Sequence, residues 1–207
     1  MSVYCSWFWS VDRSLERVCE VFKPTVLIGA SGQPGAFTET IIRMVSANVD
    51  RPVILPLSNP TEQSEVFPVD AFAWSGGKAL VAAGSPFDDV SVDGRIYRVG
   101  QGNNAFIFPG IGLGVIIAKA KKVTDSMFYA AAKALANEVT HDELASGLLF
   151  PTIDRLTEVS SSVAHAVILD AIENGLAEPL TAAEIEQHLK DGRWFPDYPQ
   201  YEISHDD

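Results

Sequence analysis

The chain has 207 residues, and its 27 acidic and 15 basic side chains give a formal net charge of −12 at pH 7. Nucleic acids and anionic membrane surfaces attract clustered Lys and Arg, so this balance argues against both as partners. Hydrophobic residues make up 47% of the chain and charged residues 20%, which is typical of a globular protein with a substantial core. The net charge does not exclude a small anionic substrate, since its binding site needs only a few local hydrogen-bond donors.

Two cysteines, Cys5 and Cys19, are too few for a disulfide framework and lack metal-ligand spacing, so we expect reduced thiols. The start of the chain lacks the basic region and cleavage site of a signal peptide, and no apolar run is long enough for a membrane span. We expect a cytoplasmic protein, or one of an organellar matrix if a targeting segment lies upstream. The opening carries aromatic side chains that we expect to pack on the fold: Tyr4, Trp7, Phe8 and Trp9.

The first half of the chain alternates strand and helix patterns. Apolar runs at Thr25–Gly29 and Pro52–Leu57 suit strands buried on both faces, and Ala79–Ala83 suits a third strand. Helical spacing over Phe37–Asn48 and a broken helical stretch over residues 58–74 separate these strands. Strands that alternate with helices over short connections predict a parallel sheet with right-handed crossovers.

An antiparallel hairpin and a helical region are predicted beyond the third strand. Asp93-Gly94 between two short β-branched runs is the strongest hairpin signal in the chain. The run Asn104–Lys121 is apolar on nearly all sides, which predicts a buried helix. Further helices are expected over Asp125–Glu138, from the capping-box pairs Thr140/Glu143 and Thr181/Glu184, and over Val159–Glu173, which Gly175 ends. The tail from Trp194 is expected to lie over a surface.

Three segments fall where a parallel sheet binds ligands, beyond the carboxyl ends of its strands. They are Ala30–Gly35, Ser58–Thr61 and Ser85–Phe87, and a fourth candidate segment, Gly100–Asn104, precedes the predicted buried helix. The first is glycine-rich, and bare N–H groups in such a turn can bind anions. It does not match the G-x-G-x-x-G dinucleotide pattern, and no acidic residue ends a strand about 20 residues later. From the residues alone, a plain strand-to-helix turn is the better explanation.

Asparagine amides stand in two of these segments. Asn59 has a structural explanation as an Asx turn before Pro60, and a functional one as a neutral fork that donates to and accepts from a carboxylate or hydroxyl. One residue of the pair Asn103-Asn104 can cap the following helix. The pair could also hold an anionic group at the positive end of that helix.

Other catalytic signals are missing from the sequence. None of the four histidines lies near a predicted strand end, and none has metal spacing with another His or Cys. There is no serine nucleophile elbow and no Walker loop. Asp88-Asp89 could approach the site but suits an exposed turn. The residues alone therefore point to no catalytic group and no set of metal ligands.

Four blocks of the sequence resemble successive signature blocks of malic enzymes, in order and spacing. They are KPTVLIGASGQPGAFT from Lys23, RPVILPLSNPTEQSE from Arg51, ALVAAGSPF from Ala79 and GQGNNAFIFPGIGLGVI from Gly100, and the likeness runs to about Gly175. The resemblance implies oxidation of L-malate with NAD or NADP and a divalent metal, Mg²⁺ or Mn²⁺, giving pyruvate and CO₂.

The resemblance also implies roles for individual residues. Asn59 and Asn104 match positions that contact the substrate, while Asn59 and Asn103 match positions beside the nicotinamide and its ribose. Ala30, Ser31 and Gly32 match a turn that lines the cofactor cleft. The family's acid tyrosine, base lysine, three carboxylate metal ligands and G-x-G-x-x-G turn have no match before Lys23. The chain alone is thus expected to lack activity and to bind NAD weakly or not at all.

The expected fold is α/β, a partial Rossmann-like doubly wound sheet of about three parallel strands plus a small hairpin, followed by a C-terminal helical region. We expect an N-terminal segment at 1–22, helical or partly non-native, the second half of the NAD(P)-binding domain at 23–124, and helices and tail at 125–207. A homo-oligomer is expected. Two alternatives stay open: a catalytically inactive oligomerising or binding module, and half of another dehydrogenase, such as an amino-acid dehydrogenase, against which the SNPT and GQGNN motifs argue.

Overall fold

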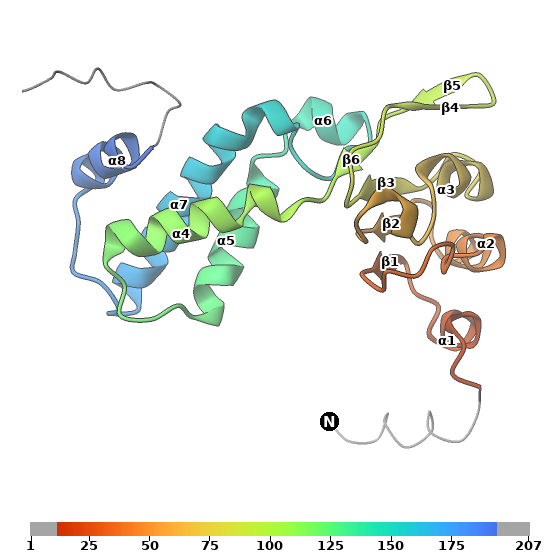
Figure 1. The fold of residues 1–207 in the computed structure, drawn as a ribbon, viewed down its shortest axis with the longest axis horizontal. Helices are drawn as coiled ribbons and strands as arrows, with labels where there is room; N and C mark the ends of the chain where they lie inside the picture. The colour runs from red at the N-terminus through yellow and green to blue at the C-terminus, as the bar shows by residue number, and fades with distance from the viewer. Residues whose placement is uncertain (1–11, 194–207) are drawn as a thin grey trace, which may run out of the picture.

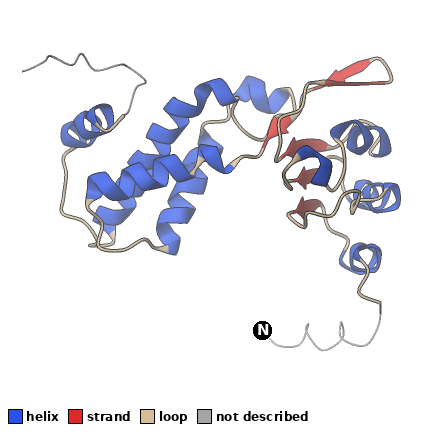
Figure 2. Ribbon diagram, in the orientation of Figure 1, coloured by secondary structure: helices blue, strands red, loops and turns tan. Residues whose placement is uncertain are grey.

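A computed structural model describes residues 12–193 (Figure 1). The predictions for Cys5, the aromatic opening and the tail from Trp194 lie outside the described residues. The described chain has a sheet unit with three helices, a hairpin, and a helical unit that follows the last strand (Figure 2). The α/β fold class is confirmed.

The sheet unit holds four parallel strands in the order β1-β2-β3-β6. They are β1 (Val26–Gly29), β2 (Val53–Pro56), β3 (Leu80–Ala83) and β6 (Gly100–Gln101). In the register, Val26 lies beside Val53 and Val53 beside Leu80. The fourth strand was not expected, because two residues are too few to show an apolar pattern.

Three helices cover one face of this sheet: α1 (Leu15–Phe22), α2 (Glu39–Asn48) and α3 (Pro68–Trp74) (Figure 1). The strand residues Leu27, Ile54 and Val81 point to this face and join side chains of all three helices in one buried cluster. The period of two along each strand places these three neighbours on the same side of the sheet. By holding the strands against the helices, this cluster positions the carboxyl ends of the strands, which carry the candidate site.

The opposite face of the sheet is exposed at its β1 edge, so the prediction of strands buried on both faces is wrong for β1. Val26 is 44% exposed and Ile28 is 66% exposed, whereas Leu27 between them is buried. The apolar composition of this strand is typical of parallel sheets with helices on both faces. Within residues 12–193, helices pack on one face of β1.

The predicted hairpin is confirmed. Strands β4 (Val90–Val92) and β5 (Arg95–Tyr97) pair antiparallel. Asp93 and Gly94 both have positive φ, 49° and 76°, as a two-residue type I′ turn requires. At the base of the hairpin, the Tyr97 ring stacks on Phe72 of α3 with a centroid distance of 4.6 Å.

The helical unit has its own hydrophobic core. Its helices are α4 (Phe108–Ala118), α5 (Asp125–Asn137), α6 (His141–Ala145), α7 (Leu156–Glu173) and α8 (Ala182–Asp191). The helical unit also contains the 3-10 turns η2 (Asn104–Phe106) and η3 (Ile153–Arg155), whereas η1 (Thr61–Gln63) lies in the sheet unit. Buried side chains of α4, α5, α7 and α8 form one cluster, separate from that of the sheet. Residues before about 103 therefore pack in the core of the sheet unit, and residues after it pack in the core of the helical unit. The domain limits given above stay predictions.

The expected helix over Asn104–Lys121 is shorter and less buried than predicted. The turn η2 precedes α4, Pro109 lies in the first turn of α4, and Lys119 ends the helix at a φ of 49°. Phe108 is 55% exposed and Ile116 is 73% exposed. A helix that is apolar on all sides has no amphipathic pattern, so the sequence alone could not show which face packs against α7.

Both capping boxes are confirmed at the starts of α6 and α8, and Gly175 follows α7 with a φ of 67°.

The loop after α6 packs against β6 and the residue that follows it, and so contacts the sheet unit. A Cβ at Gly102 would lie 3.3 Å from the Phe150 ring, and one at Gly100 would lie 3.7 Å from Leu148. Between residues 12 and 193, no helix is both long and apolar enough for a bilayer.

Candidate functional site

The candidate site lies at the carboxyl ends of β1, β2 and β3, where three loops are tied by hydrogen bonds. Gly32 N–H after β1 donates to Ser58 Oγ after β2 at 2.9 Å. Ser85 Oγ after β3 donates to Asn59 Oδ1 at 2.6 Å. Parallel strands end at one edge of a sheet, so the segments that were predicted to carry the site do meet there.

Glu65 is the hub of this network, and sequence reasoning did not identify it. Its side chain is buried, with 0% relative exposure. Oε1 accepts from Ser31 N–H and Ser31 Oγ, both at 2.8 Å, and from Ser58 Oγ at 2.5 Å. Glutamates are mostly solvated, and nothing in the spacing of SNPTEQSE distinguishes the buried Glu65 from the exposed Glu62.

The Glu65 carboxylate is held in its charged form. Burial by itself raises the pKa of Glu65, but hydrogen bonds from Ser58 and from the backbone and side chain of Ser31 outweigh it and leave the pKa lowered. Hydrogen bonds to a carboxylate favour its ionised form. These donors are neutral N–H and O–H groups, so a negative charge lies directly behind the turn after β1.

Of the two explanations for Ala30–Gly35, this arrangement favours the plain strand-to-helix turn over a turn with bare N–H groups for anions. The amide of Ser31 donates to Glu65, that of Gly32 to Ser58, and that of Gln33 to Ser31 Oγ at 3.2 Å. A phosphate would find these donors occupied and a buried carboxylate behind them. An anionic group is therefore disfavoured at this turn. All three residues of Ala30–Gly32 are exposed.

Asn59 is exposed at the end of β2, and its peptide bond to Pro60 is cis. Its Oδ1 accepts from Ser85, which is buried, rather than from its own backbone. The oxygen is thereby fixed, and the amide N–H₂ is the end that remains to donate. The Asx-turn explanation is therefore not the one that the hydrogen bonds favour.

Asn103 and Asn104 behave differently. Asn103 Oδ1 accepts from Ala105 N–H at 2.9 Å and caps η2, as the structural explanation predicted. Asn104 is exposed, and its side chain has no hydrogen bond to any residue of 12–193. The helix α4 begins four residues after Asn104, with Pro109 in its first turn, so the pair stands at the start of η2 rather than at the start of the apolar helix. Anion binding by this pair stays a prediction.

The loop that carries Asn104 reaches the same edge of the sheet as the loop that carries Asn59. Gly102 N–H donates to Ala83 O at 2.9 Å. A Cβ at Gly102 would lie 2.8 Å from Leu57 Cδ2, so the backbone here passes directly over the residue that follows β2. Both asparagines are exposed, and neither is packed into a core. The substrate and cofactor roles assigned to these residues stay predictions.

A metal does not fit the described part of the site. Within residues 12–193, no group of three or more His, Cys, Asp or Glu side chains could hold a metal ion. The carboxylate that links the loops after β1 and β2, Glu65, is buried and accepts hydrogen bonds from Ser31 and Ser58. A metal ion at this edge of the sheet would need ligands from outside the described residues.

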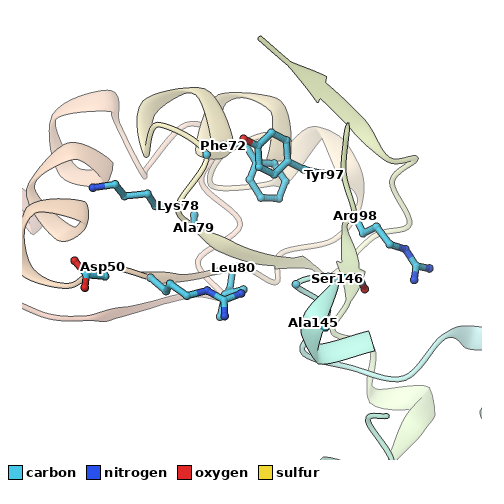
Figure 3. A pocket seen from close by; sticks show the side chains of 12 residues that line it. Asp50, Phe72, Lys78, Ala79, Leu80, Tyr97, Arg98, Ala145 and Ser146 are labelled. Carbon is cyan, nitrogen blue, oxygen red and sulfur yellow. The ribbon is translucent and has the colours of Figure 1, made fainter. Parts of the chain in front are cut away.

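A cavity of about 330 Å³ lies at the opposite end of the strands. Its lining includes Asp50, Lys78 and Leu80, which stand where β2 and β3 begin, and Tyr97 and Arg98 from the hairpin (Figure 3). Figure 3 shows the Lys78 ammonium and the Arg98 guanidinium pointing in opposite directions. They do not converge on one anion, and cofactor sites of such sheets lie at the other end of the strands.

A parallel sheet with polar loops that meet at the carboxyl ends of its strands is typical of α/β domains that bind ligands at that edge. The family model described as malic enzyme, NAD binding domain, matches residues 6–172. The chain belongs to this family.

Curated relatives and solved structures agree with this assignment. The chain is 45% identical over 195 residues to an NAD-dependent malic enzyme of Psychrobacter cryohalolentis, covering 94% of this chain and 35% of the relative. It is 46% identical over 198 residues to one of a Shewanella species, covering 95% and 35%. The malic enzyme of Entamoeba histolytica has a similar structure, with a TM-score of 0.65 and 27% identity over 83% of this chain and 33% of that one. The chain thus spans about a third of the length of these relatives.

Proposed function

We propose that this chain forms one wall of the cofactor and substrate crevice of a malic enzyme that converts L-malate to pyruvate and CO₂. The observation that carries the proposal is the hydrogen-bonded edge at which the loops after β1, β2 and β3 meet. Family membership supplies the reaction: NAD or NADP accepts a hydride from malate, and a divalent metal assists the loss of CO₂.

Within this crevice, the proposed role of the chain is to position ligands. The Asn59 N–H₂ and the Asn104 amide are neutral, exposed groups that can bind a carboxylate or a hydroxyl without adding charge. Ala30, Ser31 and Gly32 face the uncharged nicotinamide side of the cofactor, and Asn103 supports it from the fourth loop. Fixing reactants in this way lowers the entropic part of the barrier.

The remaining machinery is proposed to come from outside this chain. The acid tyrosine, the base lysine, the carboxylates for Mg²⁺ or Mn²⁺ and the pyrophosphate-binding turn that the family uses have no match in the four blocks. The occupied amides after β1 support this division, since they leave the phosphates to another loop. A cytoplasmic or matrix location stays a prediction.

A chimera tests the proposal. Residues 1–207 replace the matching third of the Psychrobacter cryohalolentis enzyme, and NADH formation from malate is followed by absorbance with NAD and Mn²⁺. We expect turnover by the chimera and none by the isolated chain. Asn59→Ala and Asn104→Ala should each lower kcat/KM about 10- to 100-fold, whereas Asn137→Ala at the exposed end of α5 should not.

Two outcomes would count against the proposal. A folded chimera that cannot oxidise malate would show that this chain does not complete the crevice. Rapid malate turnover by the isolated chain would show that the acid, base and metal ligands lie within it.

The exposed face of β1 favours a second candidate, an oligomerising module without catalysis. Val26 and Ile28 are exposed and apolar beside an outer strand edge that pairs with no other described strand. Such edges and faces favour association. Sedimentation of the isolated chain with and without NAD separates the two candidates, because a stable homo-oligomer that is indifferent to NAD supports the module.

A further inference from the structure

We propose that Glu65 is a positioning residue that holds the loops after β1 and β2 in the geometry of the crevice. The functional role of Glu65 rests on the proposed function, whereas the contacts that Glu65 makes do not depend on it. Glu65 comes from the segment between η1 and α3, and its backbone O accepts from Phe37 N–H at 3.0 Å. The residue is therefore fixed at its backbone as well as through its side chain.

The end of β1 is shaped around this carboxylate. A Cβ at Gly29 would lie 2.5 Å from Glu65 Cδ and 2.8 Å from Oε2. Real Cβ atoms do not approach heavy atoms so closely, so the strand must end in glycine for the side chain to pass. Gly29 has no positive φ, which means that space rather than backbone conformation requires a glycine here.

Every hydrogen bond to the Glu65 side chain comes from a donor, and an ionised carboxylate accepts at both of its oxygens. Oε1 meets the Ser31 N–H, the Ser31 hydroxyl and the Ser58 hydroxyl, while Oε2 lies 3.4 Å from Ser58 N–H. A glutamine has one acceptor oxygen, so its N–H₂ would face Ser58 N–H in one amide orientation and Ser31 N–H in the other. The ionised carboxylate thus sets the hydroxyl orientation of Ser58, which in turn accepts from Gly32 N–H.

The partners of the Glu65 side chain, Ser31 and Ser58, lie in the loops that follow β1 and β2. Glu65 accepts directly from Ser31, and its partner Ser58 accepts from Gly32 N–H. Ser58 stands immediately before Asn59, whose side-chain oxygen accepts from Ser85. A change at Glu65 should loosen these loops before it loosens the strands. This local effect distinguishes positioning from general stabilisation.

Amide hydrogen exchange of the isolated chain tests the proposal without any ligand. In Glu65→Gln, we expect exchange of the Ser31, Gly32 and Ser58 amides to accelerate at least tenfold, while Ile54 and Val81 in the strands change less than threefold. Glu143→Gln is the matched control, a second buried glutamate that accepts hydrogen bonds in the helical unit. It should leave the three loop amides unchanged.

Unchanged exchange at Ser31 and Ser58 in Glu65→Gln, or equal acceleration in loops and strands, would overturn the proposal. If Glu65→Gln does not fold, Ser58→Ala provides the test, because it removes the hydroxyl between Gly32 N–H and Glu65. Faster exchange at Gly32 in Ser58→Ala supports the positioning role, and an unchanged rate overturns it.

The chimera tests whether Glu65 matters for cofactor use. Glu65→Gln should lower kcat/KM for NAD at least tenfold with the fold retained, and unaltered kinetics would overturn the link to the crevice. Failure of the proposed function is visible separately, as an unmutated chimera that does not oxidise malate. In that case, loop amides that still loosen in Glu65→Gln would support the positioning role alone.

Discussion

Gly29 ends β1 at the point where the Glu65 side chain passes against the strand. Gly29→Ala places a methyl group 2.5 Å from Glu65 Cδ. Forcing an extra carbon into a packed site costs about 1–3 kcal/mol, so the free energy of unfolding in urea should fall by that amount. In a Glu65→Ala background the obstructing atoms are gone and the effect of Gly29→Ala should shrink. An equal effect in both backgrounds would contradict this contact.

Glu143 makes the stability of the helical unit depend on pH. Burial raises its pKa, but hydrogen bonds from Thr140 and Thr152 and the charge of Arg155 outweigh it, so the pKa lies below the ordinary 4.5. A lowered folded-state pKa adds stability that is present above about pH 4.5 and lost as the pH falls through the folded-state pKa.

Glu143→Gln should therefore reduce the free energy of unfolding by about 1.5–3 kcal/mol at pH 7 and by less near pH 3. Urea denaturation at the two pH values measures the difference. Glu173→Gln, at the exposed end of α7, is the control and should have little effect at either pH. A constant loss from Glu143→Gln across this range would exclude the ionised carboxylate as its cause.

At this scale, the sequence predicted where polar residues would gather but not how they connect. Asn59 and the Ala30–Gly32 turn meet at one edge because the strand pattern places them there. Glu65 was missed because a buried glutamate has no local signature; its burial depends on a glycine 36 residues earlier and on two serines from other loops. Such a carboxylate becomes evident only when the strands are adjacent.

Helix α4 packs on α7 through glycines that allow close approach. A Cβ at Gly114 would lie 2.7 Å from the backbone O of Ala164 and 2.9 Å from Val167 Cβ. Gly114→Ala must push the two helices apart, and we expect a loss of about 1–3 kcal/mol in the free energy of unfolding. Thermal and urea denaturation measure the change.

Gly112 is the matched control on the same helix. A Cβ there has no neighbour within 4 Å, so Gly112→Ala should stabilise the chain by about 0.5–1 kcal/mol through helix propensity alone. Destabilisation by both substitutions would show that α4 cannot accept alanine for reasons other than its contact with α7.

Most elements were predictable because local signals agree with the fold. Asp93-Gly94 fits its turn, and Thr140 and Thr181 begin helices with reciprocal capping hydrogen bonds. The exceptions share one cause, since β6 is two residues long and α4 is apolar all round. Neither carries a periodicity, and contacts distant in sequence decide their course.

At the scale of the whole molecule, the sheet is covered on one face and open on the other at β1. Ile28 is 66% exposed and its neighbour Leu27 is 6% exposed. Ile28→Thr should keep the free energy of unfolding within about 0.5 kcal/mol and reduce binding of an apolar dye such as ANS to the isolated chain. Leu27→Thr, its matched partner, should destabilise the sheet by burying a hydroxyl. Unchanged dye binding in Ile28→Thr would place the accessible apolar surface elsewhere.

The two hydrophobic cores predict that the units lose structure separately. Ile54 in the sheet core and Ile168 in the helical core are both fully buried, and each change to alanine should cost about 2–5 kcal/mol. Because no buried cluster includes both residues, the loss should be confined to one unit. Hydrogen exchange in Ile54→Ala should accelerate in β1–β3 more than in α4 and α7, and the reverse is expected for Ile168→Ala. If either variant lowers protection equally throughout residues 12–193, the crevice edge and the helical unit form a single cooperative body, and the loop from Gly100 to Asn104 transmits stability between them.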